Sequence, residues 1–285
     1  MTSHNYLPQS KHRQSGFTLV ELIMVIVILG AIGGTVAVFM KGPIDAYFAS
    51  ARRAALSDVA DTAVRRIARD IHKALPNSLR PTNNNQCIEF IPTRTGGRYR
   101  AATNSSGAGD ILDFNTADGS FDMLGTNSAP TDQAIRVGDF IAVYNLGITG
   151  SDAYAQNNTA RVSSVATGSL SNETKINLTT PTQFPLASDK NNRFHVIPVE
   201  EQVVAYVCDG TQKLRRTVRT LAQAQAGGQC AATGDIMATN VSACNFVYNG
   251  SDLQRNALVQ LSITLTDTGG ESVTLYHEVH TDNTP

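Results

Sequence analysis

The chain has little charge and few cysteines for its length. Charged residues make up 16% of the 285 residues and hydrophobic residues 41%, which is too apolar for an intrinsically disordered chain. Four cysteines exclude a dense disulfide scaffold but leave room for one or two bridges. The net charge of −1 means that the chain as a whole is not a polycation suited to nucleic acid. The length allows one or two domains with a sizeable core.

The charge that is present is distributed unevenly. Residues 1–16 hold two basic residues and no acidic one, and residues 17–40 hold a single charge, Glu21. Residues 41–80 hold eight basic and four acidic residues, a net +4, whereas residues 81–285 hold thirteen and nineteen, a net −6. The sequence therefore predicts a basic leader, an apolar segment, a basic rod and an acidic head.

From Leu22 to Met40, nineteen residues follow one another without a charge. A helix of that length spans about 28 Å, close to the thickness of a membrane's hydrocarbon core. Lys11 and Arg13 precede the segment, so the positive-inside rule places the N-terminus in the cytoplasm and the head outside. An ordinary secretory signal is the alternative, but no small-x-small cleavage site closes the run, and such a signal gains nothing from a carboxylate at Glu21.

A cut between Gly16 and Phe17 explains the position of Glu21. Cleavage there creates an ammonium group at Phe17 and leaves Glu21 in the first turn of a helix, where the helix dipole favours an anion. The carboxylate can also pair with an ammonium group, its own or that of a neighbouring subunit. A glycine before the cut suits a peptidase that approaches the backbone closely, because glycine has no Cβ. A role for Glu21 in complementing the helix dipole alone stays open.

The stretch Gly16–Leu22, GFTLVEL, with the apolar run after it, resembles the class III signal of type IV pilins and type II secretion pseudopilins. The resemblance implies that a prepilin peptidase cleaves after Gly16 and methylates the new N-terminus at Phe17. It implies that Glu21 positions an incoming subunit by meeting the amine of a subunit already in the filament. The implied partners are the prepilin peptidase, other major and minor pilins, the inner-membrane assembly platform and the membrane. No cofactor, metal or nucleic acid is implied.

The rod from Ile44 to Leu75 has helical periodicity. Asp61 and Arg65, like Arg66 and Asp70, are spaced for ion pairs along a helix. Its other basic side chains favour a solvated face that meets acidic surfaces of other subunits over a nucleic-acid patch, because aromatic residues are absent there. The apolar residues that step by three or four and form one stripe are Leu56, Val59, Ala63, Ile67, Ile71 and Ala74.

The head shows strand patterns between clusters of Gly, Asn, Ser, Thr and Pro. The clearest pair closes the chain: residues 258–266 and 272–281 alternate apolar and polar residues around a Thr-Gly-Gly turn, which predicts a hairpin with one buried face. The other predicted strands are residues 87–91, 111–115, 139–144, 161–165, 175–178, 195–199, 203–208, 213–219 and 246–248.

The predicted fold class is α+β of the type IV pilin kind, with a long N-terminal helix packed on an antiparallel β-sheet head. Residues 1–16 are the expected cleaved leader, and residues 17–41 the transmembrane and filament-core half of the helix. Residues 42–76 are its amphipathic half, and residues 77–285 a periplasmic β-rich head. The expected protein is a single-pass inner-membrane subunit that later enters a pilus or pseudopilus.

All four cysteines, Cys87, Cys208, Cys230 and Cys244, lie in the exported part, where an oxidising periplasm permits bridges. Four cysteines allow three connectivities. Cys208 and Cys230 flank a predicted hairpin region and its Gln/Ala/Gly-rich loop, so we expect Cys208–Cys230 and hence Cys87–Cys244. The lack of a CxxC pair or of a nearby histidine at ligand spacing favours disulfides over zinc.

Candidates for an active or metal site are weak. The sequence HEVH at residues 277–280 is one residue short of an HExxH motif, and on a strand His277 and His280 point to opposite faces. We expect His277 to be a core histidine. No catalytic residue is predicted. A calcium loop with its spacing off by one is a further weak candidate, formed by Asp113, Asn115, Asp118 and Gly119.

Further stretches carry finer resemblances. Residues 69–76 resemble the rod end of the minor pseudopilin J and of W-type minor pilins. A second set of short stretches, given at the end of this paragraph, resembles the MshO-type minor pilins of MSHA pilus biogenesis. This resemblance implies a minor pilin that acts in initiation or at the tip of such a pilus. A minor pseudopilin of a type II secretion system, a tip adhesin whose head binds a surface or glycan, and an anchored periplasmic enzyme are the alternatives. The MSHA-like stretches are residues 43–48, 96–100, 137–140, 144–147 and 239–244.

Overall fold

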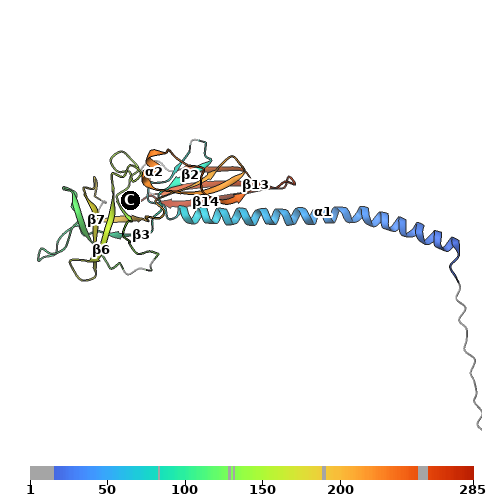
Figure 1. The fold of residues 1–285 in the computed structure, drawn as a ribbon, viewed down its shortest axis with the longest axis horizontal. Helices are drawn as coiled ribbons and strands as arrows, with labels where there is room; N and C mark the ends of the chain where they lie inside the picture. The colour runs from blue at the N-terminus through green and yellow to red at the C-terminus, as the bar shows by residue number, and fades with distance from the viewer. Residues whose placement is uncertain (1–15, 83, 128–129, 131, 188–190, 250–255) are drawn as a thin grey trace, which may run out of the picture. The chain divides into compact units, whose positions relative to one another are not determined.

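The structure is a computed structural model that describes residues 16–82, 84–127, 130, 132–187, 191–249 and 256–285. The chain divides into two compact units, the first ending at Arg52 and the second spanning Arg53–Pro285. The predicted α+β class is confirmed, because one long N-terminal helix is followed by antiparallel sheets (Figure 1).

Helix α1 (Leu19–Ile71) is continuous over 53 residues and contains Pro43. It ends at Ile71 rather than at Leu75, because the chain after it already contacts the first sheet. The backbone N–H of Leu75 donates to the carbonyl of Ile91 at 2.7 Å, and that of Thr93 donates to the carbonyl of Lys73 at 2.7 Å. These bonds to the region after β2 take the place of a last helical turn.

The first sheet has five strands in the order β1-β2-β9-β10-β11, and all of its neighbouring pairs are antiparallel. A short helix, α2 (Leu221–Ala226), lies between β10 and β11 and is capped by Thr220. The strands are β1 (Arg80–Pro81), β2 (Cys87–Phe90), β9 (Val203–Cys208), β10 (Lys213–Arg219) and β11 (Asp235–Thr239).

The second sheet consists of β12 (Val241–Asn249), β13 (Asn256–Thr266) and β14 (Ser272–Asp282) in that order. The predicted C-terminal hairpin is confirmed, because β13 and β14 pair along their whole lengths. The expectation that His277 is a core residue is wrong: His277 is exposed. Its strand lies at the edge of this sheet, so the core covers the centre of β13 but not the middle of β14.

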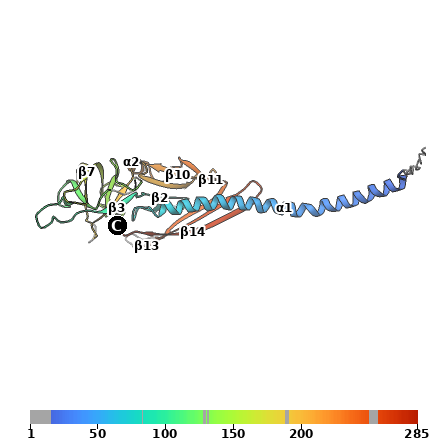
Figure 2. The ribbon, with the colours of Figure 1, turned by 90° about the horizontal axis from the view of Figure 1, so that it is seen from below.

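The part of α1 after Arg53 lies in the main core of the second unit. Strands of both sheets pack against it, and Figure 2 shows α1 between β10 and β11 on one side and β13 and β14 on the other. Because the helix is covered from two sides, its buried stripe is wider than predicted. Val59, which was expected within the stripe, is 41% exposed. The buried residues of α1 are Leu56, Ala60, Ala63, Val64, Ile67, Ala68 and Ile71.

The third sheet closes on itself and is called the barrel here. Its strand order is β3-β8-β5-β6-β7-β4, and Tyr99, which follows β3, bridges to Met123 on β4. Its core is apolar, with the rings of Phe121 and Phe194 meeting edge to face at 5.5 Å. The strands are β3 (Thr95–Arg98), β4 (Asp118–Leu124), β5 (Phe140–Val143), β6 (Thr159–Thr167), β7 (Glu173–Thr182) and β8 (Arg193–Ile197).

The barrel is an insertion between two strands that are neighbours in space. All six of its strands lie in the sequence between β2 and β9, yet β2 and β9 pair directly, with Cys87 opposite Val207 and Phe90 opposite Val204. Without the barrel, these two strands would form a hairpin. Figure 1 shows β3, β6 and β7 grouped at one end of the second unit.

A polar network attaches the barrel to the segment after α1. The amide of Asn77 donates to the carbonyl of Asn145 at 2.9 Å, and the amide of Asn145 donates to the carbonyl of Pro76 at 2.7 Å. The hydroxyl of Tyr154 donates to the carbonyl of Ser78 at 3.0 Å. Burial raises the pKa of Tyr154, so this hydroxyl keeps its proton and remains a donor.

One predicted strand is wrong. Residues 111–115 lie outside any strand, and the strand of this region is β4, which begins at Asp118. The other predicted strands each overlap an observed one. The strands that the sequence did not predict are β1, β3, β4 and β11. Of these, β1 and β11 are the edges of the first sheet, and neither they nor β3 has a strong apolar alternation.

Candidate functional site

The predicted processing residues lie at the beginning of α1. Gly16 and Phe17 precede the helix and are exposed, Phe17 by 83%. Thr18 caps the helix, because its Oγ1 accepts from the backbone N–H of Glu21 at 3.3 Å. We did not predict a role for Thr18. The Thr-x-x-Glu spacing, which is that of a capping box, is the signal that could have identified it.

Glu21 lies in the first turn of α1, as predicted, where the helix dipole favours a carboxylate. Its side chain is exposed, and its carboxylate has no ion pair or hydrogen bond within the described part of the chain. Phe17 is four residues earlier, about one helical turn away. The geometry therefore leaves Glu21 free to meet an ammonium group at the N-terminus of a processed chain.

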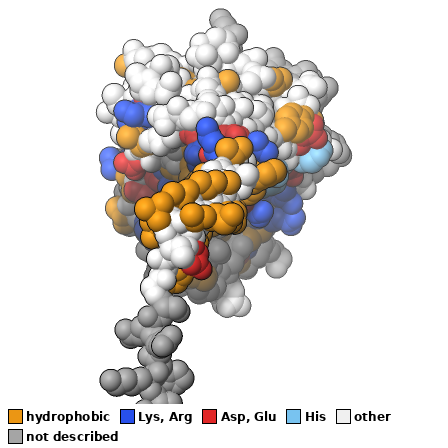
Figure 3. Space-filling model, turned by 90° about the vertical axis from the view of Figure 1, so that its right-hand side faces the viewer, with side chains coloured by type: hydrophobic (Ala, Val, Ile, Leu, Met, Phe, Trp, Pro, Cys, Tyr) orange, Lys and Arg blue, Asp and Glu red, His pale blue; other side chains and the backbone are white. Residues whose placement is uncertain are grey.

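The surface around Glu21 is continuously apolar. Every large hydrophobic residue from Phe17 to Met40 is at least 48% exposed, and Figure 3 shows these side chains gathered on α1. Among the described residues, α1 is the one helix long and apolar enough to cross a membrane. Exposed aliphatic side chains in such number require a lipid or protein environment, since each costs about 1.5–3 kcal/mol in water.

The four cysteines form two disulfides, but the predicted pairing is wrong. Cys87 is bonded to Cys230, with 6.2 Å between their Cα atoms, and Cys208 to Cys244, with 6.5 Å. All four residues are therefore bridged, in one of the two connectivities that we did not favour.

Strand alternation explains the observed pairing. Cys87 lies opposite Val207, so the two side chains share one face of the first sheet, where Cys230 packs against them. Cys208 is the next residue and points to the other face, where it packs with Cys244 against the core that contains α1. A reading of the linear sequence missed this, because it depends on the pairing of β2 with β9 across the inserted barrel.

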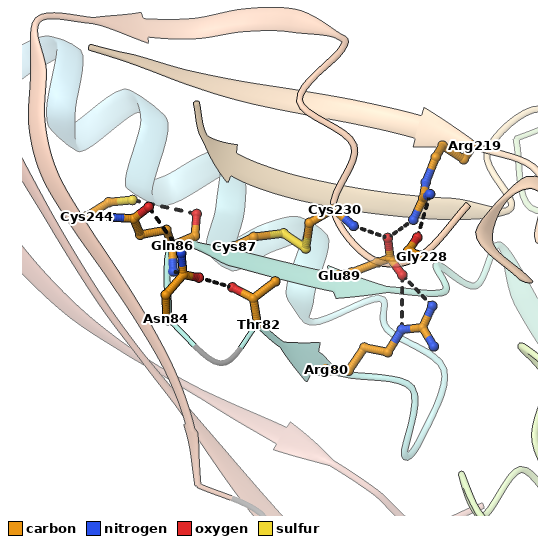
Figure 4. The surroundings of a disulfide bond; sticks show 10 residues. All are labelled: Arg80, Thr82, Asn84, Gln86, Cys87, Glu89, Arg219, Gly228, Cys230 and Cys244. Atoms are coloured by element: carbon orange, nitrogen blue, oxygen red, sulfur yellow. Dashed lines mark hydrogen bonds and ion pairs between the residues drawn. A yellow bond between two sulfur atoms is a disulfide. The ribbon is translucent and has the colours of Figure 1, made fainter. Parts of the chain in front are cut away.

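The loop that carries Cys230 is also held by a buried carboxylate (Figure 4). Glu89 is 0% exposed and accepts from Arg80 Nη2 at 2.6 Å and from the backbone N–H of Cys230 at 3.2 Å. Arg219 forms a further ion pair with Glu89. The guanidinium of Arg80 also lies 3.4 Å from the centre of the Tyr154 ring. The disulfide and Glu89 therefore hold the loop before β11 against β2, and Arg80 joins this cluster to Tyr154, which lies between β5 and β6.

The weak metal candidates do not converge on a site. Asp113 accepts from the backbone N–H of Asn115 and from the hydroxyl of Thr116, both at 2.8 Å, and these bonds lower its pKa. Asp118 accepts from the backbone N–H of Asp113 at 2.9 Å. These carboxylates stabilise a turn. No group of three or more His, Cys, Asp or Glu side chains within the described residues has the geometry of a metal site.

One comparison with known proteins gives a match. The family model described as the prokaryotic N-terminal methylation motif matches residues 11–37. Neither a curated protein nor a solved structure matches the chain. The matched segment contains Gly16, Phe17, Glu21 and most of the apolar surface described above.

The motif is the type IV prepilin signal, and it supports a place in the pilin and pseudopilin family, whose members are structural proteins. It implies processing by a prepilin peptidase and assembly with other pilins. Together with the apolar half of α1, it is consistent with anchoring in the inner membrane.

Proposed function

We propose that this protein is a minor pilin, a non-enzymatic subunit that helps to start or to cap a type IV pilus of the MSHA type. The observation that carries the proposal is the methylation motif placed directly before an exposed apolar helix with one carboxylate in its first turn. The resemblance of short stretches along the chain to MSHA minor pilins supports the finer assignment.

The proposed assembly begins with a cut. Prepilin peptidase removes residues 1–16 and methylates the amine of Phe17, while the helix from residue 17 to residue 41 holds the subunit in the inner membrane and residues 77–285 stay in the periplasm. The apolar surface then moves from lipid into a filament, where it is covered by the equivalent helices of other pilins.

Glu21 supplies the specificity of that step. In a low-dielectric filament core its carboxylate is costly unless it pairs with a cation, and the only new cation made by processing is the N-terminal amine. Because Glu21 has no partner within the described residues, the amine of a neighbouring subunit can reach it without displacing an existing contact. Pairing would therefore select subunits that have been cleaved.

Substitution of Glu21 tests this role. In Glu21→Gln the subunit should still be inserted and cleaved, while its recovery in purified filaments should fall by roughly tenfold or more, because the amine is left without a counter-charge. The matched control is Asp45→Asn, another exposed carboxylate of α1. Equal incorporation of Glu21→Gln and wild type would contradict the proposed pairing.

Deletion of the gene tests whether the protein belongs to an MSHA-type pilus or to a type II secretion system. Loss of pili without a defect in protein secretion supports an MSHA-type minor pilin. Loss of secretion with normal pili contradicts it and favours a minor pseudopilin of a type II secretion system.

A tip adhesin is the second candidate, and the inserted barrel is the observation that favours it. The barrel has its own core and interrupts two strands that pair without it. Replacing residues 92–202 by a four-residue turn with Asn-Gly at its centre should join β2 to β9 as a hairpin. If pili persist and attachment to surfaces is lost, the barrel is a receptor-binding module. If pili are lost while the Cys208–Cys244 bridge still forms, the barrel acts in assembly.

A further inference from the structure

Two arginines lie opposite each other on the outside of the barrel. Arg98 on β3 and Arg193 on β8 are direct cross-strand partners. Their neighbours Gly97 and Phe194 face the interior, since a Cβ on Gly97 would lie 2.7 Å from Cζ of Phe194. Side chains alternate along a strand, so both arginines point outward, and both are exposed.

This arrangement of two like charges is electrostatically unfavourable. Like charges directly opposite each other destabilise a sheet, and neither guanidinium has an ion pair or hydrogen bond within the described chain. This part of the chain offers many acidic side chains as possible partners, since residues 81–285 carry a net charge of −6. Nearby arginines are paired: Arg94 with Asp139 and Glu200, and Arg100 with Glu173. The pair is a positive site on an otherwise acidic unit.

The arginines line a depression of about 520 Å³ on the outer face of β3 and β8. Thr93 and Thr95 line it as well. Gly96 leaves the backbone uncovered there, and a Cβ at Gly96 would lie 2.9 Å from the carbonyl oxygen of Phe194. The depression is therefore polar and accessible, with backbone groups of β3 in its floor.

A second depression of about 220 Å³ continues from the first. The two share Thr95, Gly96, Gly97 and Leu124, and the second is also lined by Thr126 and Gln133. The combined groove is longer than a single inorganic anion. It presents hydroxyl and amide groups beside the apolar side chains of Met123, Leu124 and Ile135, and positive charge at one end.

His195 forms part of the wall opposite Gly96. Burial, followed by the charge of Arg193, lowers its pKa to about 4, so the ring is neutral at neutral pH. Its Nε2 has no hydrogen-bond partner within the described chain. Asp282 is the acidic group whose charge acts on the ring, and its Oδ1 already accepts from the backbone N–H of Thr284 at 2.8 Å. The positive charge of the site therefore comes from the two arginines.

We propose that this groove binds an acidic saccharide, with a carboxylate, sulfate or phosphate group of the sugar held between Arg98 and Arg193. Guanidinium groups bind such oxyanions through paired N–H donors, and two of them on adjacent strands can hold one anion from two sides. The sugar hydroxyls lie along Thr93, Thr95 and the exposed backbone at Gly96. Binding of the anion also removes the repulsion between the two arginines. The proposal does not depend on the role of α1 in a filament.

The test measures binding of two fluorescent probes, an oligogalacturonate hexamer and a sulfated dextran oligomer, to the full chain in detergent micelles. Maltohexaose and inorganic sulfate serve as the neutral and the non-sugar comparisons. Arg98→Gln and Arg193→Gln should each weaken binding of an acidic probe by about tenfold, and the double variant should abolish it. The matched control is Arg161→Gln on β6, an exposed arginine of the same barrel outside both depressions.

Folding is monitored through the melting temperature. Without ligand, the single variants should melt at or slightly above the wild-type temperature, because a like-charge contact has been removed. The proposal is overturned if neither acidic probe binds, or if maltohexaose binds as well as they do. It is also overturned if sulfate alone binds, or if Arg161→Gln weakens binding as much as the variants of the pair.

Discussion

Buried and half-buried charges in the second unit have partners among the described residues, whereas the exposed Glu21 has none there. Glu89 is enclosed by Arg80 and Arg219, and Asp70 on α1 accepts from Tyr206 Oη at 2.7 Å and from Arg216 Nε at 2.9 Å. Glu21 instead stands alone on an apolar surface. In an apolar environment such a carboxylate is costly without a cation, which is the basis of the pairing proposed above.

His195 gives the barrel a pH dependence. Its pKa of about 4 in the folded chain lies below the 6.5 expected when unfolded, so between these values the unfolded state binds more protons. The free energy of unfolding should therefore fall as the pH decreases from 7, by about 2 kcal/mol at pH 5 from this residue. Denaturant unfolding of wild type and His195→Asn at both pH values measures the difference, and identical pH slopes would contradict the assignment.

Local spacing predicts only part of the ion pairing. The predicted pair Asp61–Arg65 is confirmed, with Arg65 Nε 2.6 Å from Asp61 Oδ2. The predicted pair of Arg66 with Asp70 is not formed, because Asp70 faces the first sheet and binds Tyr206 and Arg216 there. A rule based on spacing along one helix does not account for competing partners that are distant in sequence.

At the scale of elements, α1 has an exposed apolar half and a half that lies at the centre of a core. The apolar half and the helical period could be predicted from charge and hydrophobicity. The width of the buried stripe could not, because it depends on two sheets that cover the helix from two sides. Ala60, which is 0% exposed, and Val59, which is 41% exposed, are adjacent in sequence and differ in burial for this reason.

Two truncations in α1 test this arrangement. Ile67→Ala, at a fully buried position, should lower the free energy of unfolding of the second unit by about 3 kcal/mol, since it removes apolar contacts and leaves a cavity. Val59→Ala should cost less than about 1 kcal/mol. Chemical denaturation of both variants gives the comparison. Equal losses would mean that the helix presents a different face to the sheets.

The disulfides connect elements that are far apart in sequence. Cys87–Cys230 spans 143 residues and Cys208–Cys244 spans 36. By loop entropy alone, the double variant Cys87→Ser with Cys230→Ser should lower the free energy of unfolding by about 5 kcal/mol. Removal of the second disulfide in the same way should lower it by about 4 kcal/mol. Unfolding of the two double variants measures these losses, and peptide mapping without reductant should recover both bridges. A peptide joining Cys208 to Cys230 would contradict the structure.

At the scale of the whole molecule, the sequence predicts the ends of the chain better than its middle. The signal around Gly16, the helix and the C-terminal hairpin follow from local patterns. The barrel does not, because its closure depends on contacts such as Tyr99 with Met123 that no local period reveals. The pairing of β2 with β9 across the barrel was missed for the same reason, and with it the connectivity of the disulfides.

The N-terminus of the protein isolated from cells tests the central claim most directly. Intact-mass and N-terminal peptide spectrometry of the membrane-extracted or filament-bound chain should find a polypeptide that begins at Phe17 and carries one methyl group on its amine. A chain that retains residues 1–16, or one cut after the apolar segment, would contradict the account.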